Sequence, residues 1–194
     1  MASVETIRNI VLCGDGSSGK TTMADNFLAL TETVSGRPSV DDGTSICDFD
    51  PAEKQHKYSI EAALTNYQHA GKHFNVFDTP GYPDFIGQFI GALQAADTAL
   101  TVVNAHSGIE VNTRRVFKEA GRANVGRMIV INKMDDENID FPSLIGNIQE
   151  MWGQQCVLLN VPVGQGSDFK GVVSTLNVPA DTAGALMDLS LIHI

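Results

Sequence analysis

A glycine-rich stretch near the N-terminus constrains the fold of this chain more than any other feature. Residues 14–21 match the pattern GxxxxGK[ST], follow the apolar run Ile7–Cys13 and precede a helix-like segment at 21–32. A strand, a glycine loop and a helix in this order favour a phosphate-binding loop, because glycines let backbone N–H groups surround a phosphate at a helix N-terminus. The residues expected to hold nucleotide phosphates are Asp15, Gly16, Ser17, Ser18, Gly19, Lys20, Thr21 and Thr22.

Two side chains of this loop are suited to charge chemistry. The Lys20 ammonium is expected to neutralise phosphate oxygens, and the Thr21 hydroxyl is expected to ligate Mg²⁺. Because Lys20 stands in a loop, we expect its side chain to be exposed and to contribute little to the core.

The order of apolar segments along the chain predicts an α/β fold. The expected helices span residues 85–95, 110–123 and 141–152, and the expected further strands span 58–66, 72–78, 98–104 and 127–132. Strands that are apolar on both faces and separated by helices indicate a mostly parallel sheet with helices on both faces. Residues 58–66 and 72–78 form an expected hairpin that supplies one antiparallel edge strand, with residues 58, 60, 62 and 64 on its apolar face.

Two other segments bear on the domain organisation. The polar stretch 33–57 has no sustained periodicity and is long for an inert connection, which favours a functional or mobile loop. Residues 156–163 and 169–176 are strand-like, so the pattern of alternating strands and helices ends there. We therefore predict a core domain at 1–153 and, at 154–194, the beginning of an inserted β-containing subdomain that looks truncated.

Two short motifs stand at predicted strand ends. Asp78-Thr-Pro-Gly81 follows the second hairpin strand, where an aspartate on the Mg²⁺ side and a glycine that senses a γ-phosphate are needed. Asn132-Lys133-Met-Asp135 follows the last predicted strand of the core. A carboxylate at Asp135 accepts two hydrogen bonds from guanine, whereas adenine presents an acceptor to it. The second motif therefore favours GTP and GDP over adenine nucleotides and disfavours a kinase or an ATPase.

Charge and composition exclude some partners. The chain has 13 basic and 23 acidic residues, a formal charge of −10, so we expect no direct grip on nucleic acid. No apolar run approaches the roughly 20 residues of a membrane span, and the first ten residues lack an apolar signal core, which favours a cytoplasmic protein without a membrane partner. Three widely spaced cysteines fit reduced thiols.

The motifs together resemble the GTP-binding domain of translation elongation factor G, above all the elongation-factor-G-like second paralogues. The resemblance rests on GDGSSGKTT, DTPGY and NKMD, on DFDPAEK before the first switch segment, and on VPVG followed by FKGVV, and it covers roughly residues 7–176. It implies a P-loop GTPase fold, GTP hydrolysis with Mg²⁺, a monomer, and action on the ribosome in translocation, mainly through domains outside this chain.

The resemblance also implies residue roles. Ser59 stands where the family has the threonine of its Arg-Gly-Ile-Thr switch, so Thr21, Ser59 and Asp78 form the implied Mg²⁺ set. Lys20, Gly81 and Tyr82 form the implied catalytic set.

The sequence departs from the family at three further points. Tyr82 replaces the histidine that orients the attacking water, Ser17 replaces an acidic residue implicated in binding a monovalent cation, and no fifth guanine motif follows the insert. The substitution at Tyr82 leaves open an alternative function, a GTP-binding switch or sequestering module with negligible turnover.

Overall fold

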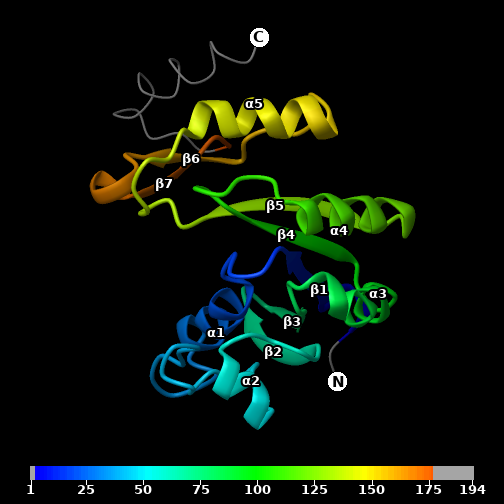
Figure 1. The fold of residues 1–194 in the computed structure, drawn as a ribbon. Helices are drawn as coiled ribbons and strands as arrows, with labels where there is room; N and C mark the ends of the chain where they lie inside the picture. The colour runs from blue at the N-terminus through cyan, green and yellow to red at the C-terminus, as the bar shows by residue number, and fades with distance from the viewer. Residues whose placement is uncertain (1–2, 177–194) are drawn as a thin grey trace. The chain divides into compact units, whose positions relative to one another are not determined.

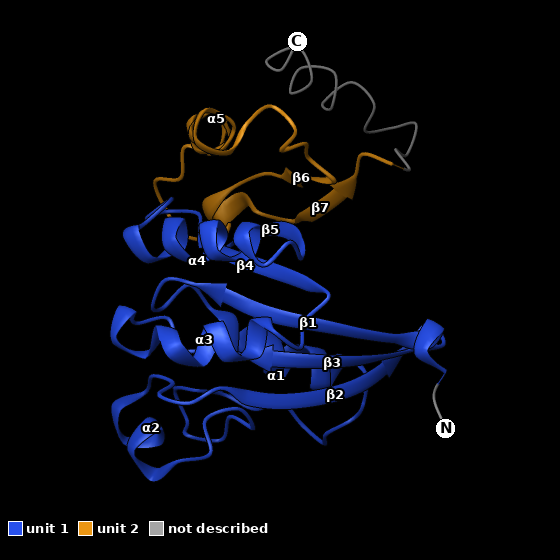
Figure 2. Ribbon diagram, turned by 90° about the vertical axis from the view of Figure 1, so that its right-hand side faces the viewer, with its two compact units in different colours: residues 1–132 blue, residues 133–194 orange. Residues whose placement is uncertain are grey.

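The structure is a computed structural model and describes residues 3–176. The strands are β1 (Ile7–Gly14), β2 (Ala63–His69), β3 (Lys72–Asp78), β4 (Thr98–Asn104), β5 (Gly126–Asn132), β6 (Asn160–Val163) and β7 (Gly171–Ser174). The helices are α1 (Lys20–Leu30), α2 (Pro51–His56), α3 (Ile86–Leu93), α4 (Val111–Arg122) and α5 (Phe141–Trp152), with short 3-10 turns at Val4–Thr6, Pro83–Phe85 and Gly166–Asp168. The chain divides into two compact units, residues 1–132 and 133–194 (Figure 2).

The first unit contains a five-stranded sheet in the order β2-β3-β1-β4-β5 (Figure 1). The pairs β1/β3, β1/β4 and β4/β5 are parallel, and the β2/β3 hairpin is antiparallel. The predicted fold class is thereby confirmed, including its one antiparallel edge strand. Leu12 lies opposite Asp78 across β1 and β3, so the glycine loop and the Asp78 motif begin at the same edge of the sheet.

Helices cover both faces of this sheet because β1 alternates its side chains between two cores. Val11 and Cys13 pack with Phe89 of α3 and Val116 of α4 on one face. Leu12 packs on the other face with a second cluster, whose members include Ala24 and Leu28 of α1 and Val76 of β3. Figure 1 shows α1 and α3 on opposite sides of β1. The continuous apolar character of residues 7–13 follows from this double burial.

The predicted face of the first hairpin strand is wrong. The strand begins at Ala63 rather than Tyr58, and its buried residues are Ala63, Thr65 and Tyr67, whereas Leu64 is 59% exposed. Residues 58–62 belong instead to a loop whose N–H groups at Ile60 and Glu61 donate to the Glu53 carboxylate. The prediction extended the strand's alternation of side chains back into this loop. Because side chains alternate with a period of two, this placed residues 58, 60, 62 and 64 on the buried face in place of residues 63, 65 and 67.

The polar stretch 33–57 contains a helix that the absence of periodicity concealed. Asp50 begins α2 as its N-cap, and its carboxylate accepts a hydrogen bond from the Ala52 N–H at 2.7 Å. Glu53 returns a carboxylate oxygen to the Asp50 N–H at 3.0 Å, which completes a capping box. A six-residue helix is too short to show helical periodicity, so its cap residues were the available signal.

The strand predicted at 127–132 is also more exposed than expected. It is β5, an edge strand of the five-stranded sheet, and Met128 is 44% exposed. An edge strand has a sheet neighbour on one side alone, so its apolar composition did not require full burial.

The second unit contains α5 and an antiparallel pair of short strands, β6 and β7. Asp140 caps α5 by accepting a hydrogen bond from the Ser143 N–H at 3.1 Å. The predicted domain boundary after residue 153 stays a prediction, and the tract after Leu176 lies outside the described residues. No helix among residues 3–176 combines the length and the apolar character needed to cross a membrane.

Asp25 on α1 anchors the long loop and gives the fold a testable pH dependence. Its side chain is 1% exposed, and its Oδ1 accepts a hydrogen bond from the Ile46 N–H at 3.0 Å. Burial raises the pKa of Asp25, so its ionised form is penalised in the folded state.

We expect Asp25→Leu to lower the free energy of unfolding by about 1 to 3 kcal/mol, because it leaves a loop N–H without its acceptor. Asp25→Asn keeps an acceptor oxygen and is the matched control. Since the folded pKa lies above the unfolded value of about 3.9, wild type loses stability as the pH rises through that raised pKa, relative to Asp25→Asn. Denaturant titrations at several pH values measure both effects. A pH dependence identical in wild type and Asp25→Asn would contradict this assignment.

Candidate functional site

The glycine loop joins β1 to α1 with backbone angles that favour glycine. Gly14 has φ of 139° and Gly19 has φ of 94°, and Gly19 is the N-cap of α1. A glycine cap carries no side chain to bond the first N–H groups of the helix, which have no partners within the helix itself. The N-terminus of α1 therefore presents donors and a favourable dipole to an anion held by the loop.

Lys20 is buried rather than exposed, contrary to the sequence-based expectation. Its side chain is 5% exposed, and Nζ donates to the backbone oxygen of Asp15 at 2.7 Å. Burial lowers the pKa of Lys20, while the negative charges of Asp78 and Asp15 oppose that shift. The lysine folds back over its own loop, which encloses the ammonium at the centre of the site.

Gly81 packs directly against the glycine loop. A Cβ atom added at Gly81 would lie 2.5 Å from Nζ of Lys20 and 2.6 Å from both the oxygen of Asp15 and the nitrogen of Gly16. Any side chain at position 81 would therefore clash with the loop. The structure brings the DTPG motif and the loop into contact, as a group that senses the terminal phosphate requires.

Thr21, Ser59 and Asp78 meet in one cluster. The Thr21 hydroxyl donates to Oδ2 of Asp78 at 2.7 Å and lies 3.1 Å from Oγ of Ser59. Adjacent ligands of an octahedral Mg²⁺ lie about 2.9 Å apart when each bond is 2.0 to 2.1 Å. The two hydroxyls thus have a spacing that suits two ligands of one Mg²⁺.

Asp78 supplies the second sign that this cluster fits a cation. Its side chain is 1% exposed, and Oδ1 has no hydrogen-bond partner among the described residues. Burial raises the pKa of Asp78 to about 7, although the Thr21 hydrogen bond and the Lys20 charge lower it. A desolvated carboxylate with a free oxygen gains stability from a nearby cation, so these residues fit the group that the resemblance implies.

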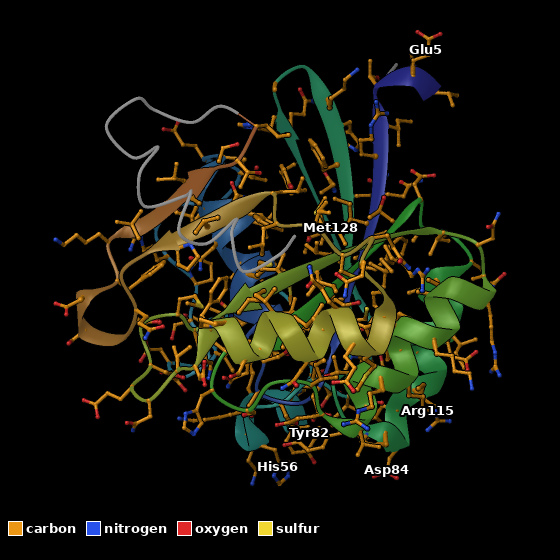
Figure 3. All side chains as sticks on the ribbon, turned by 90° about the horizontal axis from the view of Figure 1, so that it is seen from above. Glu5, His56, Tyr82, Asp84, Arg115 and Met128 are labelled. Carbon is orange, nitrogen blue, oxygen red and sulfur yellow. The ribbon has the colours of Figure 1, made fainter. Side chains whose placement is uncertain are left out.

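Tyr82 lies at the mouth of the loop and is 42% exposed. A Cβ atom at Gly16 would lie 3.3 Å from Cζ of the Tyr82 ring, so the ring rests on the backbone of Gly16. Figure 3 labels Tyr82 beside Asp84 and His56 on the same side of the molecule. The structure therefore brings together the three residues of the implied catalytic set, Lys20, Gly81 and Tyr82.

The guanine motif is divided between the two units. Asn132 ends β5 in the first unit, and its Nδ2 donates to the Ser18 oxygen at 2.9 Å, so it braces the glycine loop. Lys133 and Asp135 begin the second unit, where Lys133 has φ of 60° and accepts a hydrogen bond from the Asp136 N–H at 3.2 Å. Asp135 is exposed. Of the other predicted loop residues, Ser18 is buried, whereas Ser17 and Thr22 are exposed.

The sequence reasoning missed several supporting residues of the site. Asn112, 2% exposed on α4, donates from Nδ2 to the Gly81 oxygen at 2.7 Å and thereby holds the DTPG segment. Asp48 accepts a hydrogen bond from Oγ of Ser59 at 2.8 Å. Glu53, which accepts a hydrogen bond from the Ile60 N–H in the loop beside Ser59, could have been found from the sequence, because Asp50 and Glu53 have the spacing of a capping box. Asn112 carried no signal, because its hydrogen-bond partners are 31 or more residues away in the chain.

Comparisons with known proteins agree with this geometry. The family described as the Elongation factor Tu GTP binding domain matches residues 5–190. An elongation factor G-like protein of Mycobacterium tuberculosis is 34% identical over 160 residues, which are 82% of this chain and 22% of that protein. Elongation factor G 2 of Streptomyces coelicolor is 34% identical over 168 residues, 87% of this chain and 24% of the relative.

The chain is also similar to a mitochondrial factor and to a solved bacterial structure. The mitochondrial ribosome-releasing factor 2 of Bos taurus is 32% identical over 89% of this chain and 22% of its own length. A crystal structure of a Thermus thermophilus protein matches 96% of this chain and 30% of that chain with a TM-score of 0.87 and 28% identity. The chain thus spans about a quarter of the length of the curated relatives it matches.

Proposed function

Because the chain belongs to the elongation factor Tu GTP-binding domain family, which is a family of GTP-binding translation factors, we propose that it binds GTP and GDP with Mg²⁺ and hydrolyses GTP. In the translation factor of which this domain would be part, hydrolysis would serve elongation on the ribosome. The names of the relatives support this wider role. The role is proposed rather than established for this chain, because the chain spans about a quarter of the length of those relatives.

One observation carries the proposal most directly: the contact between the DTPG segment and the glycine loop around Lys20. Gly81 approaches Nζ of Lys20, and Thr21, the next residue of α1, bonds Asp78. A lysine that reaches the β and γ phosphates, a hydroxyl for Mg²⁺ and a glycine that reads the γ-phosphate are the parts that phosphoryl transfer needs.

The residues divide the work by charge and geometry. The loop and the N-terminus of α1 hold the β-phosphate with backbone N–H groups, and Lys20 gives up its bond to the Asp15 oxygen to pair with phosphate. Thr21 and Ser59 would hold Mg²⁺ directly and Asp78 through water, and the ion would neutralise charge on the phosphate oxygens. Asn132, Lys133 and Asp135 are proposed to hold guanine.

The remaining predictions stay part of this proposal. They are a domain core at 1–153 with an inserted subdomain beginning at 154, a monomeric state, a cytoplasmic location, and ribosome binding mainly through other domains. One relative, the ribosome-releasing factor 2 of Bos taurus, is named as mitochondrial.

Tyr82 decides between hydrolysis and the alternative, a binding module without turnover. Phosphoryl transfer depends on an attacking water held in line, and a neutral phenol is a weaker base than the imidazole that the family usually has there. We expect unassisted turnover of about 10⁻⁴ to 10⁻² s⁻¹ for the wild type, and faster turnover for Tyr82→His.

Multiple-turnover phosphate release from GTP by the full-length protein that contains this domain, with and without ribosomes, measures the effect for the wild type, Tyr82→Phe and Tyr82→His. Tyr82→Phe separates a role of the hydroxyl from a role of the ring. Rapid turnover by the wild type without ribosomes would contradict the slow unassisted turnover expected here, and the absence of turnover in every condition would favour the alternative, a binding module without turnover.

A further inference from the structure

The ring of Tyr82 packs against the backbone of the glycine loop at Gly16. Position 16 carries glycine, and the Cζ end of the ring would lie 3.3 Å from a Cβ atom there, with Cε1 and Cε2 at 3.6 Å. A larger side chain at position 16 would push the ring away. The phosphate loop and the aromatic residue after DTPG are therefore complementary in shape.

Tyr58 packs against the ring of Tyr82. The centroids of Tyr58 and Tyr82 are 5.1 Å apart, and their planes meet at 65°, the edge-to-face arrangement that aromatic pairs prefer. His56 extends the row, with its ring centroid 5.7 Å from that of Tyr58. Among the described residues, neither tyrosine hydroxyl has a hydrogen-bond partner, so these two side chains meet through their rings.

Both tyrosines are attached to residues of the proposed nucleotide site. Tyr58 immediately precedes Ser59, which contacts Thr21, and Tyr82 immediately follows Gly81. With the rings in contact, Gly81 lies against the Lys20 ammonium and the Gly16 nitrogen. A γ-phosphate between Lys20 and Gly81 would have to separate these two residues. A diphosphate has no γ-phosphate to place between them.

We propose that Tyr58 and Tyr82 form an aromatic clasp that holds the DTPG segment closed on the phosphate loop and so disfavours guanosine triphosphate relative to diphosphate. This inference rests on the proposed function and assigns Tyr58 a part in selecting between the two nucleotides. Binding of the triphosphate requires the contact between the two rings to break, so that Gly81 can move away from Lys20 and make room for the γ-phosphate. The interaction energy of one aromatic pair corresponds to a difference of about two- to tenfold between the affinities for the diphosphate and the triphosphate.

The test measures the ratio of affinities for GDP and for the non-hydrolysable β,γ-imido analogue of GTP, by displacement of a fluorescent GDP. Tyr58→Leu and Tyr82→Leu should each shift the ratio toward the triphosphate by about two- to tenfold. Tyr58→Phe keeps the ring and should leave the ratio unchanged. The double variant should match Tyr82→Leu, because Tyr58 has no ring contact with position 82 left to lose once the Tyr82 ring is gone. Additive shifts, or an unchanged ratio in Tyr58→Leu, would overturn the clasp.

A second measurement requires no nucleotide. Amide hydrogen exchange of residues 14–19 and 78–82 should quicken in Tyr58→Leu and not in Tyr58→Phe, because the clasp covers these segments. Unchanged exchange in Tyr58→Leu would overturn the clasp whatever the chain binds. Failure of the wild type to bind either guanine nucleotide would refute the proposed function instead, so the two failures are distinguishable. Circular dichroism checks that each variant is folded.

Discussion

Replacing Asp135 with Asn should weaken GTP binding by about 10²- to 10⁴-fold relative to xanthosine triphosphate. Guanine donates two hydrogen bonds from N1 and the exocyclic amine, and each such bond to a carboxylate contributes about 1.5 to 3 kcal/mol. Xanthine presents a carbonyl in place of that amine, and the asparagine amide can donate to it. Competition binding of the two nucleotides to wild type and variant measures the ratio, which does not depend on the absolute affinity of this chain.

The neighbouring Asp136 provides the matched control, because it is also exposed and carries the same charge. Asp136→Asn should leave the ratio of GTP to xanthosine triphosphate affinities unchanged. If Asp135→Asn behaves like Asp136→Asn, Asp135 does not read the base and the proposed guanine motif is wrong.

Lys20→Ala should remove most of the affinity for both GTP and GDP, by at least about 10²-fold. The ammonium is enclosed beside Gly81, so its charge-assisted bonds to phosphate form in a poorly solvated site, and two of them contribute about 3 kcal/mol or more. Titration with a fluorescent GDP analogue measures the loss.

The fold should tolerate this change, because burial of a charged ammonium is itself costly and Lys20 makes one short hydrogen bond, to the Asp15 oxygen. Thermal unfolding followed by circular dichroism tests that expectation. Lys118→Ala, at an exposed position on α4, is the control for loss of one positive charge. Nucleotide affinity that survives in Lys20→Ala would refute the assignment of the phosphate site.

The sequence predicted those parts of the fold that depend on local patterns. Residues 72–78 and 98–104 form strands with the predicted bounds, since β-branched or aromatic residues lie within each segment and mark it locally as a strand. The prediction of the buried face of β2 was wrong because the Glu53 carboxylate holds residues 60 and 61 in a loop. The alternation of side chains along the sequence does not reveal that contact.

The site divides in the same way. The loop, DTPG and NKMD are contiguous motifs whose backbone chemistry is encoded over a few residues, so they were visible in the sequence. Burial of Lys20 and the bond from Asn112 to Gly81 arise when β1, β3 and α4 meet, and no short segment contains that information. The contact of Tyr58 with Tyr82 joins residues 24 positions apart in the sequence and likewise required the fold.

The central claim is that this chain is a guanine nucleotide-binding domain that uses Mg²⁺. Displacement of a fluorescent GDP from the chain by GTP and by ATP, in the presence and absence of Mg²⁺, tests it most directly. We expect GTP to displace the probe, more tightly with Mg²⁺ than without it, and ATP to fail at a concentration about a hundredfold higher. Equal displacement by ATP, or no binding of the probe with Mg²⁺ present, would contradict the claim.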